Sequence, residues 1–321
     1  MAHRPLGAQI SHYLKSRGVD VIFGIPGVHN QELYRGIEEA GITHILGRHE
    51  QGVGFMADGY ARASGKPGVA YVITGPGLCN IMTPMGQAYS DSVPMLVISS
   101  CLDETAYRRG QLHQMLDQEG AARAVCEWSE TAHSYSAAYG LLERSFEEFA
   151  SKRPRPKHIQ VPISVLEAEA PQFPPCRSAA VPSYKDDSAI SKVADMLGHA
   201  KRPLFVLGGG ACKADVLPVI ETCKAAVVTT FAGRGLVPAT YPYFWGSFLP
   251  RPDTAPAIAG ADLVIVLGSE LSEVDLWREH LGHRAPMVRV DIDPEVLSDL
   301  HHADLRIAMR VEDFVPSLAA A

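Results

Sequence analysis

The chain has 321 residues, of which 46% are hydrophobic and 20% charged, and its formal net charge is −7. This length allows two domains with full-sized cores, and the composition is typical of a globular protein. The acidic balance argues against nucleic acid as a partner, and no apolar run is long enough to span a bilayer. The N-terminus lacks the apolar segment of a signal peptide, and six scattered cysteines without CxxC spacing favour a cytoplasmic protein with neither disulfides nor a metal site.

The first half of the chain alternates β-branched segments with segments of helical periodicity. We expect helices over residues 6–17, 30–37, 50–63, 77–90 and 136–150, and strands over residues 19–25, 43–46, 68–73, 95–99 and 158–162. Such alternation predicts a parallel sheet with helices on both faces, closed by the last of these strands. Ligands of such sheets bind beyond the carboxyl ends of the strands.

The second half repeats this pattern after a segment rich in proline, alanine and serine. That segment, residues 166–186, lacks periodicity and is predicted to be a linker between domains 1–165 and 187–321. The second domain is expected to contain a helix over residues 187–198 and strands over residues 202–207, 225–230, 261–267 and 287–291. The predicted fold class is therefore α/β, with two doubly wound domains and mainly parallel sheets. Residues 311–318 are expected to begin a linker to a further domain.

Glu50 occupies an unusual position at the start of a predicted helix. It follows the short apolar run 42–46, and small or apolar residues follow it closely. A carboxylate placed there is hard to solvate and needs a specific partner. The alternative is that Glu50 only favours the helix N-terminus, where acidic residues are common.

Three loops fall at the predicted carboxyl ends of strands in the first domain: residues 25–29, 48–50 and 74–77. Each Pro-Gly pair in them could form an ordinary tight turn. Because carboxyl ends of parallel strands share one edge of the sheet, the three loops together predict a ligand site.

The motif Arg48-His-Glu-Gln-Gly, with residues 57–65 and 74–80, resembles the pyrimidine-binding domain of thiamine-diphosphate enzymes. The most similar group is the acetolactate synthases and related 2-oxo acid decarboxylases. The resemblance implies that Glu50 hydrogen-bonds the pyrimidine ring of the cofactor and promotes the imino tautomer that removes the thiazolium proton. It also implies that the pyrimidine half is lined by Pro26, Gly27, Val28, Thr74, Gly75, Pro76 and Gly77, with Asn80 at a matching position.

Residues 108–118 form a polar segment after a predicted strand. Related decarboxylases place a substrate-facing His or Gln in the equivalent loop, so the resemblance makes His113 and Gln114 catalytic candidates. The alternative is a solvated loop, since loops are polar in most proteins. The acidic stretch 269–277, together with residues 25–29 and 112–117, most resembles the 5-guanidino-2-oxopentanoate decarboxylases. The carboxylates could pair with a guanidinium or could only be a solvated helix start.

The second domain carries a Gly208-Gly-Gly210 turn that could hold a phosphate. Lys213 stands where GxGxxG would have its last glycine, which disfavours a dinucleotide site. The domain resembles the central domain of the acetolactate synthase family, which binds FAD in some members. Those members usually carry an arginine shortly after the Leu-Gly turn, whereas this chain has Glu270, and this departure disfavours FAD.

Enzymes of the family that this chain resembles have a third domain, which binds the diphosphate and Mg²⁺ through a Gly-Asp-Gly…Asn motif. The chain contains no Gly-Asp-Gly triplet. It is therefore expected to be the N-terminal two-thirds of a decarboxylase or acetolactate-synthase-like enzyme, acting on a 2-oxo acid as a homodimer or homotetramer and inactive without the diphosphate-binding domain. A fragment, one subunit of a split enzyme and a non-catalytic remnant all fit the sequence. The alternative function is a nucleotide-binding or regulatory dimerisation module.

Overall fold

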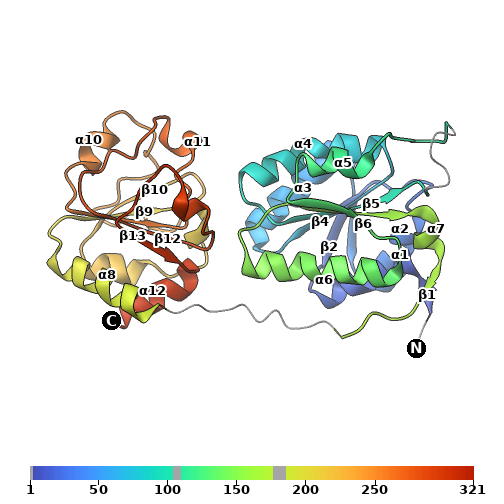
Figure 1. Cartoon of the computed structure of the whole chain (residues 1–321), viewed down its shortest axis with the longest axis horizontal. Helices are drawn as coiled ribbons and strands as arrows, with labels where there is room; N and C mark the ends of the chain where they lie inside the picture. The colour runs from blue at the N-terminus through green and yellow to red at the C-terminus, as the bar shows by residue number, and fades with distance from the viewer. Residues whose placement is uncertain (1–2, 104–109, 176–185) are drawn as a thin grey trace. The chain divides into compact units, whose positions relative to one another are not determined.

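The computed structural model describes residues 3–103, 110–175 and 186–321. The chain divides into two compact units, Met1–Val181 and Pro182–Ala321, each with its own sheet (Figure 1). Arg108, Arg109 and positions 176–185 of the predicted linker lie outside the described residues. The linker's first residues belong to the first unit, where β8 (Glu169–Ala170) pairs antiparallel with β1 (Arg4–Pro5).

The main sheet of the first unit has six parallel strands in the order β3-β2-β4-β5-β7-β6. These strands are β2 (Val21–Gly24), β3 (Thr43–Leu46), β4 (Gly68–Val72), β5 (Met95–Cys101), β6 (Trp128–Thr131) and β7 (Lys157–Pro162). The central strands are buried on both faces, as expected for a parallel sheet that helices cover on two sides.

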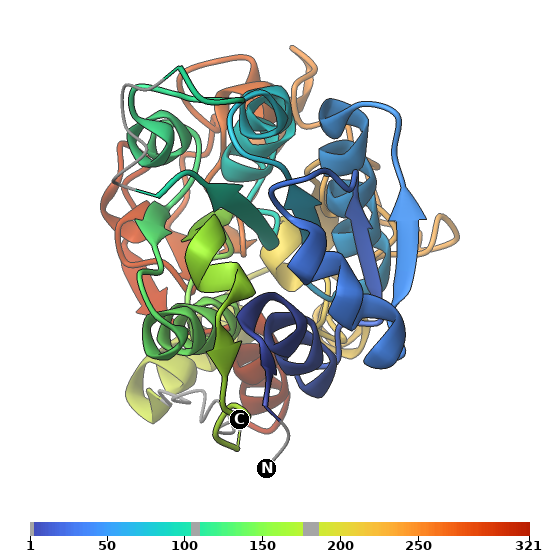
Figure 2. The same ribbon diagram turned by 90° about the vertical axis from the view of Figure 1, so that its right-hand side faces the viewer.

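The helices form one layer on each face of this sheet, as Figures 1 and 2 show. They are α1 (Leu6–Ser16), α2 (Gln31–Glu39), α6 (Tyr135–Ser151) and α7 (Ile163–Glu167) on one face, and α3 (Glu50–Ser64), α4 (Pro76–Ser90) and α5 (Gln118–Arg123) on the other. Because side chains alternate along a strand, Tyr71 and Ile98 pack under the first layer, whereas Ala70 and Val97 pack under the second.

The expectation that strand 158–162 closes the sheet is wrong. This strand, β7, lies between β5 and β6. The strand at this edge of the sheet is therefore β6, which was not predicted from the sequence. Of the four residues of β6, only Trp128 and Ser129 are buried, and the segment is largely polar. A short polar edge strand has no hydrophobic pattern that distinguishes it from a loop.

The second unit has a five-stranded parallel sheet in the order β10-β9-β11-β12-β13. Its strands are β9 (Pro203–Leu207), β10 (Ala226–Thr229), β11 (Leu263–Leu267), β12 (Met287–Asp291) and β13 (Leu305–Ala308). One face is covered by α8 (Asp187–His199), α9 (Leu217–Thr222) and α12 (Val311–Ala319), and the other by α10 (Thr254–Ile258) and α11 (Glu273–Leu276). Both units are thus α/β folds with mainly parallel sheets, which confirms the predicted fold class.

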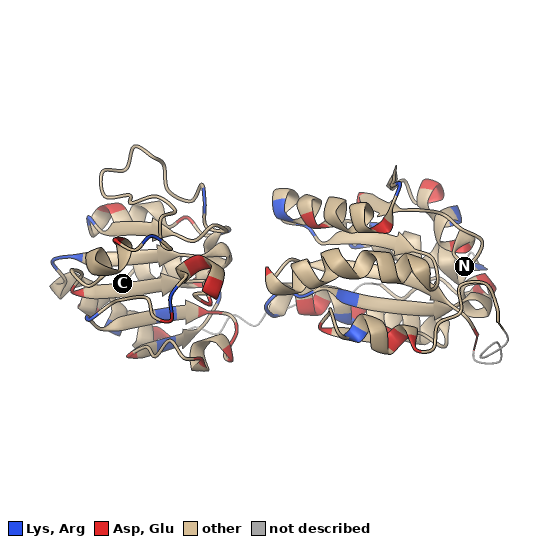
Figure 3. Ribbon diagram, turned by 90° about the horizontal axis from the view of Figure 1, so that it is seen from above, with Lys and Arg blue, Asp and Glu red and all other residues tan. Residues whose placement is uncertain are grey.

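The charged residues of the two units are of both signs and are scattered over the face that Figure 3 shows. Among the helices of the described residues, none has the length and apolarity needed to cross a membrane.

The expectation that residues 311–318 begin a linker is also wrong. They form α12, whose Phe314, Val315 and Leu318 are buried in the core of the second unit. Pro316 lies inside the helix and hides the helical pattern from sequence reasoning.

Replacing Phe314 by Ala should lower the free energy of unfolding of the second unit by about 3 to 5 kcal/mol, because it leaves a cavity under a fully buried ring. Denaturant unfolding of the whole chain measures this change. Leu300→Ala is the matched control, since Leu300 is 85% exposed and its loss should have little effect. Equal effects of the two substitutions would contradict the assignment of α12 to the core.

Candidate active site

The first unit has a topological switch point between β2 and β4. From β2 the chain passes to β3 on one side, and it then returns to β4 on the other side. The loops that follow these two strands therefore diverge at the carboxyl edge of the sheet, which is where ligands of doubly wound folds bind.

The loop after β2 contains the predicted residues Pro26, Gly27 and Val28. The side chain of Asn30 closes this loop: its Oδ1 accepts a hydrogen bond from the Gly27 amide at 2.7 Å, and its Nδ2 donates to the Ile25 carbonyl at 3.4 Å. Asn30 occupies the N-cap position of α2 but makes no capping bond to the helix. The loop is thus fixed internally and presents Pro26 and Val28 to the surface, with Val28 60% exposed.

Glu50 begins α3, and its carboxylate has a specific partner. Asn80 Nδ2, on α4, donates to Glu50 Oε2 at 2.9 Å. The other oxygen, Oε1, faces Gly77: a Cβ added at Gly77 would lie 3.5 Å from it. His49 caps the helix by accepting a hydrogen bond from the Gln51 amide, so it holds the turn that carries Glu50. Glu50, Gly77 and Asn80, which the sequence placed in one site, therefore lie together.

The loop after β4 contains the predicted residues Thr74, Gly75 and Pro76. Thr74 donates through its amide and its hydroxyl to Ser100 Oγ, at 3.1 and 2.9 Å, which fastens the loop to β5. Gly75 has a φ of +68°, and a Cβ there would overlap the carbonyl oxygen of His113. Only glycine satisfies both constraints.

Gln118 holds this loop from behind, and the sequence analysis missed it. Its Oε1 accepts from the Gly75 amide at 2.8 Å, and its Nε2 donates to the Ser100 carbonyl at 2.8 Å and to Ser99 Oγ at 3.1 Å. No local pattern distinguishes this glutamine, because its partners are 18 to 43 residues away along the chain.

His113 lies against the Gly75 loop, and its ring meets the ring of His29 edge-on, with centroids 5.6 Å apart. His113 has a φ of +63°, a conformation that residues other than glycine seldom adopt. Burial and then the charge of His113 lower the pKa of His29. Neither Nδ1 has a hydrogen-bond partner among the described groups, so each ring leaves one hydrogen-bonding position unfilled.

Gln114 serves a different purpose in the same loop. The side-chain Oε1 of Gln114 accepts a hydrogen bond from the backbone amide of Gln111. The backbone amide of Gln114 donates to the backbone carbonyl of Gln111, so the two residues close a turn. Gln114 also lines a cavity of about 560 Å³ beyond the carboxyl ends of β5 to β7.

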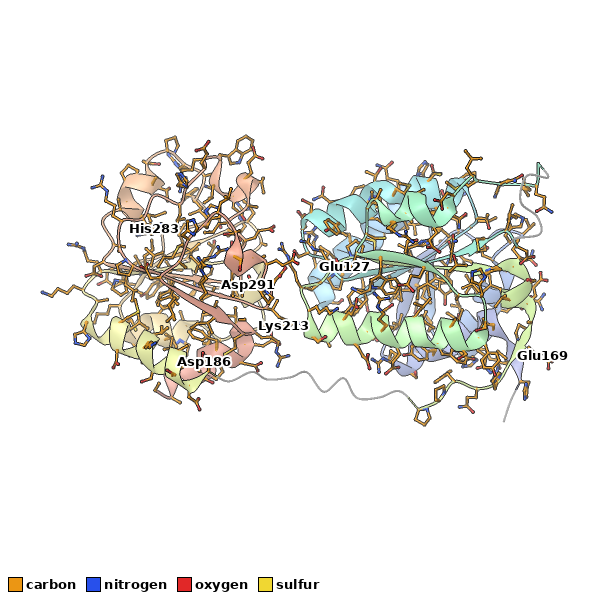
Figure 4. All side chains as sticks on the ribbon, in the orientation of Figure 1. Glu127, Glu169, Asp186, Lys213, His283 and Asp291 are labelled. Carbon is orange, nitrogen blue, oxygen red and sulfur yellow. The ribbon has the colours of Figure 1, made fainter. Side chains whose placement is uncertain are left out.

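At the switch point of the second unit, the loops after β9 and β11 are in contact with each other. Gly208 and Gly210 donate their amides to the carbonyls of Leu267 and Gly268, at 2.9 and 3.0 Å, and a Cβ at either glycine would collide with Gly268. The glycines of this turn are therefore needed for contact between two loops. Figure 4 shows Lys213 just after the turn and Asp291 at the end of β12.

The acidic residues of the second unit include one with a structural role. Asp275 accepts hydrogen bonds from the Phe231 amide at 3.4 Å and from Ser272 Oγ at 3.0 Å, so it ties α11 to the loop after β10. Among the described residues, no three His, Cys, Asp or Glu side chains come together as metal ligands would.

His158 is a buried histidine behind the site. Its Nε2 bonds to Ser99 Oγ at 2.8 Å and its Nδ1 to Ser129 Oγ at 2.7 Å, so it extends the chain of contacts from Gly75 through Gln118 into the sheet. Burial lowers the pKa of His158 to about 3, which keeps the ring neutral in the folded protein.

The free energy of unfolding should fall as the pH is lowered from 6.5 toward 3. In this window the unfolded chain protonates His158 at its ordinary pKa while the folded protein does not, and the difference amounts to about 1 kcal/mol per pH unit. Denaturant unfolding at several pH values measures the slope. His158→Gln, which keeps one donor and one acceptor, should reduce it, and an unchanged slope would contradict the neutral buried ring.

Comparisons with known proteins agree with this geometry. Residues 4–121 match the family described as "Thiamine pyrophosphate enzyme, N-terminal TPP binding domain", and residues 190–318 match its central domain. The chain is 42% identical over 301 residues to a probable 2-ketoarginine decarboxylase of Pseudomonas aeruginosa, covering 92% of this chain and 54% of the relative.

More distant relatives are acetolactate synthase large subunits. The isozyme 2 subunit of Escherichia coli is 28% identical, with 97% of this chain and 58% of the relative covered, and a probable subunit of Methanocaldococcus jannaschii is also 28% identical, with 96% and 54% covered. The chain thus spans about half the length of these curated relatives. It belongs to the thiamine pyrophosphate enzyme family, of which it carries the N-terminal and central domains.

Proposed function

We propose that the first unit is the pyrimidine-binding half of a thiamine-diphosphate-dependent 2-oxo acid decarboxylase. The observation that carries this proposal is the Glu50 carboxylate at the switch-point edge, with Oε2 held by Asn80 and Oε1 facing a glycine. A flat heterocycle needs such a surface, because a side chain at Gly77 would stand beside the carboxylate oxygen.

The chain's residues would bind and orient the pyrimidine ring. Glu50 Oε1 would share a proton with a ring nitrogen, and Asn80 would keep the carboxylate turned toward it. The Gly75 loop, held by Gln118, and the loop after β2 would line the ring. Thiamine diphosphate, when bound, supplies the chemistry that removes carbon dioxide from the 2-oxo acid.

The substrate would approach from the side of His113 and Gln114. His113 lies over the Gly75 loop with a ring nitrogen available, so it is suited to exchange a proton with the substrate. The name of the relative from Pseudomonas aeruginosa points to 2-ketoarginine as the 2-oxo acid.

The diphosphate and Mg²⁺ would be held by a further domain or a separate subunit, because the sequence has no Gly-Asp-Gly triplet. Without that part, the described units would bind the cofactor weakly and would not turn over substrate. We further propose a cytoplasmic homodimer or homotetramer. We propose that the second unit does not bind FAD, since its switch-point glycines contact Gly268.

Titration of the chain with thiamine diphosphate and Mg²⁺ by calorimetry should show weak binding, which Glu50→Ala abolishes because the proton-sharing carboxylate is lost. Glu38→Gln, at an exposed acid on α2, is the control and should bind as the unmodified chain does. Binding that survives Glu50→Ala would contradict the site. Binding of FAD or adenine nucleotides instead would favour the nucleotide-binding or regulatory module.

In the complete enzyme, Glu50→Gln should lower kcat at least about 100-fold, because a neutral amide cannot accept the proton. Circular dichroism should show an unchanged fold, since an amide can still accept the hydrogen bond from Asn80. Near-normal turnover would show that Glu50 has no role in activating the cofactor.

A further inference from the structure

A cavity of about 560 Å³ lies beyond the carboxyl ends of β5, β6 and β7, beside the Gly75 loop. It is lined on one side by Thr74, which begins that loop, and on another by the segment that carries Gln114 and Asp117. Its volume is in the range of sites for small molecules. We call it the tail pocket.

Carboxylates dominate the charge of the tail pocket. Asp103, Asp117 and Glu119 line it, and no lysine or arginine is among the described residues that do so. Glu119 is neutralised by Arg123 and also accepts from Thr131. Asp103 accepts from the amide and the hydroxyl of Ser164, and Asp117 accepts from the Gly120 amide as the N-cap of α5. Within the described part of the chain, these two carboxylates have no cationic partner.

The thiol of Cys101 also lines the tail pocket. Burial, followed by the charges of Asp103 and Glu119, raises its pKa to about 12. The thiol therefore stays protonated at neutral pH and adds no charge to the pocket.

Gln160 adds an acceptor that lacks a donor. The residue is 7% exposed and lines the tail pocket; its Nε2 donates to Thr131 Oγ1 at 2.7 Å, whereas its Oε1 has no partner among the described groups. A buried acceptor without a donor is unfavourable unless a ligand supplies an N–H group.

We propose that the tail pocket binds the guanidinium group at the end of a 2-oxo acid substrate. This inference rests on the proposed function, because the keto end of the substrate must then lie toward the Gly75 loop. A guanidinium is permanently charged and presents five N–H donors and no acceptor. It therefore matches the carboxylates of Asp103 and Asp117, which have no cationic partner among the described residues, and the Gln160 oxygen, which has no donor among them. A neutral urea group of the same shape has an oxygen acceptor where the guanidinium has an N–H donor. It therefore offers fewer donors to these acceptors and carries no charge.

Ligand-observed NMR on the 321-residue chain tests this assignment with two isosteric probes. 5-Guanidino-2-oxopentanoate should bind saturably, and 5-ureido-2-oxopentanoate should bind at least about tenfold more weakly, as expected for loss of a charge-assisted hydrogen bond. Asp117→Asn, which keeps the helix cap, and Gln160→Met should each reduce the preference for the guanidino acid. Asp186→Asn is the matched control, because Asp186 caps α8 through the same kind of contact and lies at the start of that helix (Figure 4).

The assignment of the tail pocket to the guanidinium would be overturned by any of three results. These are equal binding of the two probes, no saturable binding of the guanidino acid, or an unchanged preference for the guanidino acid in Asp117→Asn. The titration with thiamine diphosphate is read separately. If the chain prefers the guanidino acid but does not bind thiamine diphosphate, only the proposed function is contradicted. If it binds thiamine diphosphate but shows no preference for the guanidino acid, only the assignment of the tail pocket is contradicted.

Discussion

The close packing of α3 against α4 is the constraint on which the site depends. A Cβ at Gly54 of α3 would collide with Pro84 of α4, so glycine at this position lets the two helices approach. Their first turns then lie together, and Asn80 of one reaches Glu50 of the other. The carboxylate is thus positioned by the packing of two helices that follow different strands, and the rigid sheet beneath them fixes its distance from the loops.

The two units share one architecture, but the loops at their switch points are held in different ways. In the first unit each of the two diverging loops is held by a side chain of its own, Asn30 for the loop after β2 and Gln118 for the loop after β4. In the second unit the loops after β9 and β11 hydrogen-bond to each other through Gly210 and Gly268. The same fold therefore provides a candidate active site in one unit and a loop contact in the other, and fold class alone would not have separated them.

The sequence predicted the parts of the fold that have strong local patterns. Strand 43–46 and the start of the helix at Glu50 agree with the structure to the residue, because β-branched runs and small helix-forming residues mark them. The edge strand β6 and helix α12 were missed, since one is polar and the other contains Pro316. Gln118 and His158 were missed because their partners come from distant strands, which only the folded topology brings together.

We propose that the first unit holds a preassembled pyrimidine site. The most direct measurement is an NMR titration of the isotope-labelled chain with thiamine, which carries the pyrimidine ring but no diphosphate. We expect shift changes at the amides of Gly27, Gly75 and Gly77 and at the side chains of Glu50 and Asn80. Changes centred on the Gly208–Gly210 turn, or no changes in the first unit, would contradict it.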